Sequence, residues 1–122
     1  MRQAFAQQAL IELADGGDER APGAAVTVAL CGHWEHEPPC AVPHRSDVAS
    51  TEAGLAVRVL FACDPADESD VRARVDGALA GGELPVPPPE GAVPTRGRLL
   101  HSAPAQVSDA DSAVAARFVE AP

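Results

Sequence analysis

The sequence lacks lysine, asparagine and tyrosine altogether, and it holds one tryptophan and one methionine in 122 residues. Its 9 basic residues are therefore all arginines, set against 18 acidic residues and a formal net charge of −9. Proteins that bind nucleic acids or anionic membranes neutralise phosphates with clustered Lys and Arg. Because the few cations here are scattered, we expect neither nucleic acid nor membrane as a partner. The sequence leaves a protein partner and the oligomeric state open.

Long apolar runs are missing as well. No run approaches the roughly 18 residues of a membrane-spanning helix. Gln7, Gln8 and Glu12 interrupt the apolar stretch that an N-terminal signal peptide would need. The sequence thus predicts a cytoplasmic protein. It contains only 3 cysteines, and an odd number in a reducing compartment favours free thiols or metal ligands over a framework of disulfides.

Aromatic residues make up only 3% of the chain, although 46% of it is hydrophobic. The core must therefore be built mainly from Ala, Val and Leu, with Phe5, Phe61 and Phe118 adding bulk. A chain of this length is typical of one domain that buries a modest core.

Three segments carry helix signals. In residues 2–14, apolar side chains recur at helical spacing. Residues 64–80 begin with Asp64, a favourable N-cap, and continue with proline and acidic residues that suit the first helical turn. Ser108, followed three residues later by Asp111, predicts the start of a short C-terminal helix.

Two segments carry strand signals. Residues 24–31 and 54–63 alternate apolar side chains with a period of two, which predicts strands that pair as an antiparallel hairpin. Several prolines mark residues 37–53 as the loop of that hairpin. Residues 98–102 predict a third strand, at the edge of the sheet.

The expected order of elements is α-β-β-α followed by β-α. It predicts an α+β fold, in which a small antiparallel sheet carries helices on one face. We place the compact domain core at residues 1–82 and a Pro-rich linker at residues 83–97. The edge strand and the short C-terminal helix, residues 98–122, are expected to belong to the same domain.

Residues 31–44 hold the densest group of metal-binding side chains in the chain. The candidate ligands are Cys31, His33, His36, Cys40 and His44. Thiolate and imidazole are the groups that bind zinc best, and a structural zinc site needs four of them. The window therefore predicts a structural, zinc-type site in the hairpin loop. In the expected hairpin Cys63 lies far from Cys31, so it is not predicted to be a ligand.

Three other interpretations of the window stay open. The loop, with Trp34 at its tip, is also suited to contacting a protein partner without any metal. A small metalloenzyme with an open coordination position is another alternative. No further motif marks a substrate pocket, so we do not expect an enzyme. Lastly, Cys31 and Cys40 are close enough in sequence to form a disulfide, which requires an oxidising compartment.

Overall fold

The computed structural model of the chain describes residues 1–31, 42–84 and 95–121. Its elements run in the order β1 (Gln3–Leu13), α1 (Ala21–Cys31), β2 (His44–Thr51), β3 (Gly54–Cys63), α2 (Glu68–Ala80), β4 (Glu83–Leu84), β5 (Thr95–Ala105) and α3 (Ser112–Glu120). Short 3₁₀ turns at Pro65–Asp67 and Asp109–Asp111 lead into α2 and α3. No helix of the described segments is long and apolar enough to cross a membrane.

The strands form one antiparallel sheet in the order β2-β3-β1-β5-β4. Two β-α-β units, β1-α1-β2 and β3-α2-β5, interlock so that β1 and β3 are neighbours at the centre. This is the split-βαβ, or ferredoxin-like, topology, here extended by β4 and α3. The predicted α+β class and antiparallel sheet are confirmed, but the sheet has five strands rather than two or three.

The helix predicted over residues 2–14 is wrong, because this segment is the central strand β1. Phe5, Ala9 and Leu13 recur every four residues, and this spacing fits one face of a strand as well as one face of a helix. Gln7 lies on the same face of the strand and is buried. This polar residue interrupts the alternation of apolar residues by which a strand is recognised in a sequence. Pairing with β3 on one side and β5 on the other overrides the local helix signal.

The strand predicted over residues 24–31 is also wrong, since the segment lies in helix α1. Val26 and Leu30, one helical turn apart, are buried, whereas Val28 is 36% exposed. Small residues at the start of the helix, such as Ala21 and Ala25, are buried as well and let it approach the sheet closely. The expected hairpin between residues 24–31 and 54–63 therefore does not exist.

Strand β2 takes up much of the segment expected to be a loop, residues 37–53. It pairs with β3 through a two-residue turn, in which Thr51 Oγ1 donates to the Gly54 carbonyl oxygen at 2.7 Å. Gly54 has φ of 143°, and a Cβ there would lie 2.7 Å from the Ile11 carbonyl oxygen. Only glycine fits this turn against β1.

The other predictions agree better with the structure. Strand β3 and helix α2 lie where they were expected, and the Asp64 side chain accepts a hydrogen bond from the Ala66 amide at 3.0 Å. The strand expected at residues 98–102 is the longer β5, which lies between β1 and β4 instead of at an edge. Most of the predicted linker, residues 85–94, lies outside the described residues.

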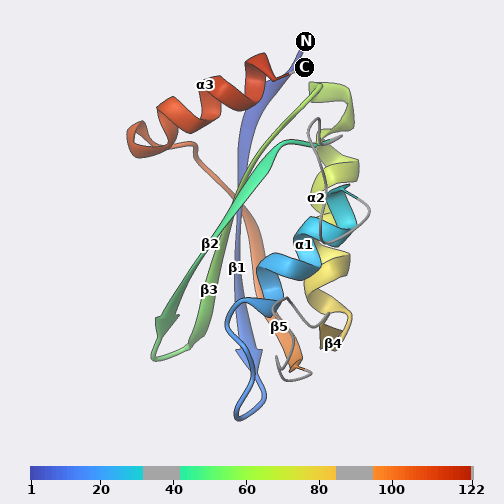
Figure 1. Cartoon of the computed structure of the whole chain (residues 1–122), viewed down its shortest axis with the longest axis vertical. Helices are drawn as coiled ribbons and strands as arrows, with labels where there is room; N and C mark the ends of the chain where they lie inside the picture. The colour runs from blue at the N-terminus through green and yellow to red at the C-terminus, as the bar shows by residue number, and fades with distance from the viewer. Residues whose placement is uncertain (32–41, 85–94, 122) are drawn as a thin grey trace.

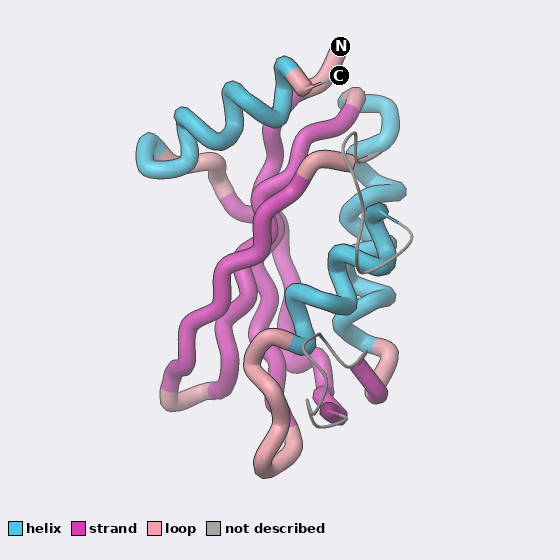
Figure 2. Tube along the Cα trace, in the orientation of Figure 1, coloured by secondary structure: helices cyan, strands magenta, loops and turns pink. Residues whose placement is uncertain are grey.

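Helices α1 and α2 lie side by side on one face of the sheet, and α3 lies on the other face (Figures 1 and 2). The expectation that all helices pack on one face is therefore not confirmed. The main core is between α1, α2 and the sheet. Its fully buried members include Ile11, Val26, Leu30, Val57, Val59, Phe61, Val71, Val75 and Leu79.

A buried polar cluster joins α2 to the sheet beneath it. Gln7 Nε2 donates to Ser102 Oγ at 2.7 Å and to Asp76 Oδ1 at 3.3 Å. Arg72 Nη1 donates to the Ala6 carbonyl oxygen at 2.7 Å and also to Gln7 Oε1. Because Gln7 is only 3% exposed, its amide depends on these partners rather than on water.

Replacing Gln7 by alanine should destabilise the fold markedly. The change leaves partly buried Arg72 and Asp76 without one of their hydrogen bonds, which costs about 1–3 kcal/mol. Gln8→Ala is the matched control, because Gln8 is the exposed neighbour on the opposite face of the strand. Urea unfolding of both variants measures the difference, and equal midpoints would contradict the buried role of Gln7.

The turn before α3 is fixed by a single carboxylate. Asp111 Oδ2 accepts from the Ser108 amide at 2.8 Å and from Arg58 Nη2 of β3 at 2.6 Å. The Ser108 amide contributes most, and the Arg58 guanidinium next, to lowering the pKa of Asp111 from 3.8 to about 2. This residue therefore both caps the helix and ties it to the sheet.

We expect Asp111→Asn to lower the free energy of unfolding at pH 7 by about 1–2 kcal/mol. The pKa of Asp111 is lower in the folded state, so its contribution is complete above about pH 4 and is lost as the pH falls through 2. The difference in free energy of unfolding between wild type and variant should therefore decrease as the pH falls from about 4 to about 2, which acid unfolding curves can measure. Asp109→Asn, in the same turn, is the control and should have the free energy of unfolding of the wild type at pH 7 and at low pH.

Candidate functional site

The structure brings together two of the five predicted ligands, Cys31 and His44. Cys31 is the last residue of α1, and His44 is the first residue of β2. The Cys31 Sγ atom lies 3.7 Å from His44 Nδ1. The β1-α1-β2 crossover produces this proximity, because it returns the chain from the end of α1 to the edge of the sheet beside β3.

Both ring nitrogens of His44 have hydrogen-bonding partners. Nδ1 lies 2.9 Å from the Val42 carbonyl oxygen, and Nε2 lies 3.1 Å from Thr27 Oγ1 on α1. A carbonyl oxygen can only accept, so in the neutral ring the proton is on Nδ1 and the Thr27 hydroxyl donates to Nε2. Thr27 thus fixes the orientation of the imidazole, a role that no sequence pattern indicates.

Cys31 is disulfide-bonded, and the other half of that bond lies outside the described residues. The expectation of a free thiol at this position is therefore not met. A disulfide sulfur is not a thiolate, and the thiolate is the form that binds metal ions. In this oxidised state the Cys31 sulfur at the end of α1 lies 3.7 Å from His44 Nδ1 at the start of β2.

The remaining predicted ligands, His33, His36 and Cys40, lie outside the described residues, as does Trp34. Within residues 1–31, 42–84 and 95–121, no group of three or more His, Cys, Asp and Glu side chains is placed to hold a metal ion. Of the five predicted ligands, the described part of the chain therefore contains Cys31, in a disulfide, and His44.

Cys63 is a free, buried cysteine at the end of β3. The sequence argument that separated it from Cys31 relied on a hairpin that does not exist, because β3 pairs with β2 such that Phe61 faces His44. Burial raises the pKa of the Cys63 thiol, and the nearby carboxylates of Asp67 and Glu68 raise it further. Burial and the raised pKa both disfavour the thiolate, which is the reactive form of a cysteine.

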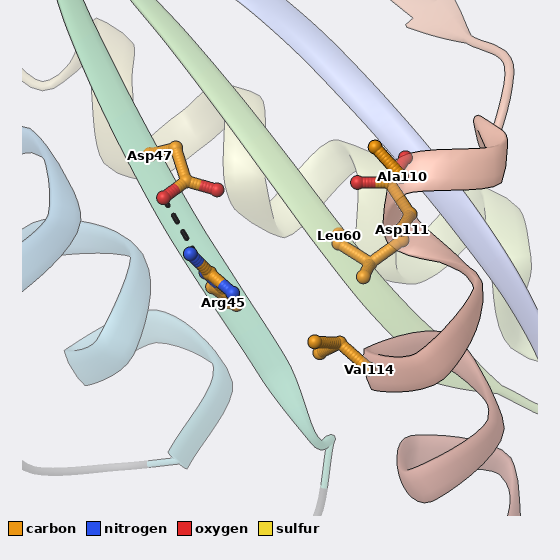
Figure 3. Close-up of a pocket in the computed structure, with 6 residues that line it drawn as sticks. All are labelled: Arg45, Asp47, Leu60, Ala110, Asp111 and Val114. Atoms are coloured by element: carbon orange, nitrogen blue, oxygen red, sulfur yellow. Dashed lines mark hydrogen bonds and ion pairs between the residues drawn. The ribbon is translucent and has the colours of Figure 1, made fainter.

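A second feature is a hollow of about 240 Å³ between β2, β3 and α3, on the face of the sheet away from α1 (Figure 3). Its lining residues are Arg45, Asp47, Leu60, Ala110, Asp111 and Val114. The charged groups pair with each other or with neighbours: Arg45 Nε lies 3.3 Å from Asp47 Oδ1, and Asp111 is bound by Arg58. No nucleophile or histidine lines it, so this hollow offers no evident chemistry.

No protein-family model, no curated protein and no solved structure matches this chain. The topology does not help either, because the split-βαβ arrangement supports many unrelated functions. Any functional conclusion must therefore come from the side chains themselves, and the Cys31–His44–Thr27 group is the strongest constellation among the described residues.

The cysteine chemistry can be tested by counting thiols. The chain has 3 cysteines and Cys63 is free, so protein purified without reductant should show one thiol per chain in denaturant. Full reduction should raise the count to three. In the native state the remaining thiol should react slowly at neutral pH, because its pKa is raised by burial. Cys63→Ala should remove the signal before reduction, and three thiols in the untreated wild type would contradict the disulfide at Cys31.

Proposed function

We propose that the reduced protein binds a zinc-type transition-metal ion at Cys31 and His44, and that the ion has a structural role. The 3.7 Å separation between Cys31 Sγ and His44 Nδ1 carries the proposal. A tetrahedral zinc ion with Zn–S of about 2.3 Å and Zn–N of about 2.0–2.1 Å would hold these two atoms about 3.6 Å apart. The fold supplies this spacing without any metal present.

His33, His36 and Cys40 are the expected sources of the other ligands. They lie outside the described residues, and two of the three are enough to complete a four-coordinate site. An ion bound in this way would fasten the segment between α1 and β2 to the body of the domain. It would take the place of the disulfide at Cys31, since one sulfur cannot serve both bonds at once.

Thr27 fits the role of an orienting partner for the ligand. If Nδ1 binds the ion, the ring proton moves to Nε2, which then donates to Thr27 Oγ1 across the same 3.1 Å. Metal-bound histidines commonly donate their second ring N–H to such a partner, and loss of the partner lowers metal affinity about 10- to 100-fold. The Val42 carbonyl, which accepts from Nδ1 in the oxidised state, would have to give up this hydrogen bond.

The proposal predicts metal content that depends on the redox state. Protein purified without a His-tag and kept reduced should retain close to one equivalent of zinc by elemental analysis, and oxidised protein should retain almost none. Less than about a tenth of an equivalent in reduced protein, after exposure to zinc and desalting, would overturn the proposal.

Point variants locate the site. His44→Ala should abolish retention of the metal, and Thr27→Val should weaken zinc affinity about 10- to 100-fold, measured by competition with a chelator. Thr27→Ser keeps the hydroxyl and should bind like wild type. His101→Ala is the matched control, because His101 is an exposed histidine of β5, and it should leave the affinity unchanged.

The two alternatives to a structural metal site depend on residues that lie outside the described part of the chain. The interpretation in which the loop around Trp34 contacts a protein partner stays a prediction, as does the open-site metalloenzyme. A reduced protein that binds no metal would favour the first of these, and a bound ion with an exchangeable water ligand would favour the second.

A further inference from the structure

We propose that two copies of this chain associate through the outer edge of β2, in the one antiparallel register that is centred on Ser46. The proposal does not depend on metal binding. It rests on the outward backbone groups of β2, on an unpartnered hydroxyl at its centre, and on the order of charges along the strand.

Strand β2 is an outer strand of the sheet and pairs with β3 alone among the described strands. The Pro43 carbonyl oxygen accepts from the Ala62 amide at 3.1 Å, so odd-numbered residues of this strand point their backbone groups toward β3. Ser46, Val48 and Ser50 therefore point theirs away from the sheet. Such an edge is a template for pairing with a further strand.

Ser46 is also the site of an unusual polar atom. Among the described residues, its Oγ is the one buried side-chain oxygen or nitrogen without a hydrogen-bond partner. In an antiparallel pair centred on Ser46, the two Ser46 residues lie directly opposite each other and their side chains share a face. The Ser46 Oγ is buried in the single chain, so each hydroxyl must turn about χ1 toward the edge before one can donate to the other and supply the missing partner.

The charges on β2 select this register. Arg45 and Asp47 flank Ser46 and are both exposed on the other face of the strand (Figure 3). About a two-fold axis at Ser46, Arg45 of each copy faces Asp47 of the other, at the closely spaced, non-hydrogen-bonded positions of the ladder. Registers centred on Arg45 or on Asp47 would instead place like charges opposite each other.

The resulting contact is isologous and extends one sheet through both copies. The net charge of −9 on each chain opposes association, and pairing along one edge buries little surface. We therefore expect a weak dimer that forms at high protein concentration, and sedimentation velocity should be followed up to about 1 mM protein.

Charge reversal gives a sharp test. Arg45→Asp and Asp47→Arg should each sediment as monomers, with dissociation constants raised at least about tenfold, because every facing pair then carries like charges. An equimolar mixture of the two variants should dimerise again, and so should the double variant in which the two residues are exchanged. Single variants that associate like wild type, or a mixture that stays monomeric, would overturn the register.

Crosslinking tests the same geometry independently. Facing residues in a hydrogen-bonded pair have Cα atoms about 5.5 Å apart, which suits a disulfide. Ser46→Cys should form a covalent dimer under mild oxidation, mapped by mass spectrometry to the two introduced thiols. Ser50→Cys, on the same face of the same strand, is the matched control and should not crosslink. A wild type that stays monomeric at about 1 mM, or equal crosslinking of both variants, would overturn the proposal.

Discussion

The fold depends on the pairing of β1 with two strands at once. Its backbone groups are used by β3 on one side and β5 on the other, and Ala6 and Ile11, which point to opposite faces, are both fully buried. A strand covered on both faces and both edges cannot move without disturbing every layer. The positions of α1 and α2 follow from this central strand, since each helix connects the two strands of its β-α-β unit and packs back over the centre of the sheet.

The Cys31–His44 pair follows from the same topology. The first crossover leaves β1, forms α1 over the sheet and returns as β2, so the end of α1 must come close to the start of β2. The short distance between sulfur and imidazole is thus set by secondary structure that forms without them. A metal site of the proposed kind, built on the ends of α1 and β2, would need fewer ordering interactions from its remaining ligands.

The sequence specified some elements well because their signals are chemical rather than periodic. Asp64 and Ser108 have side chains that satisfy exposed amides at helix starts, and both helices begin beside them. The predictions for the first two elements are wrong because their apolar residues fit either period: in β1 the four-residue spacing of Phe5, Ala9 and Leu13 suits a helix as well as a strand, and buried Gln7 interrupts the alternation. In β2, Ser46, Asp47 and Ser50 carry no apolar alternation, so its strand character appears only when β3 is beside it. Of the candidate site, the sequence identified the two donors, while Thr27 emerged only from the packing of α1.

If the proposed metal site forms, the Cys31 sulfur has two mutually exclusive uses, and the redox state of the chain determines how much metal it binds. Closing the disulfide removes two electrons and two protons from a pair of thiols, whereas a metal ion binds the thiolate that the disulfide consumes. Any ion bound only by the reduced form stabilises that form by mass action, by about 2.7 kcal/mol when its concentration is 100 times its dissociation constant. A stronger metal site therefore makes the disulfide easier to reduce. His44 Nδ1 lies 3.7 Å from the sulfur and would be a second ligand of the proposed ion, so the hydrogen bonds of His44 to Val42 and Thr27 would affect both equilibria. In the disulfide state His44 Nδ1 lies 3.7 Å from the Cys31 sulfur, and in the proposed metal-bound state one ion would join the same two side chains.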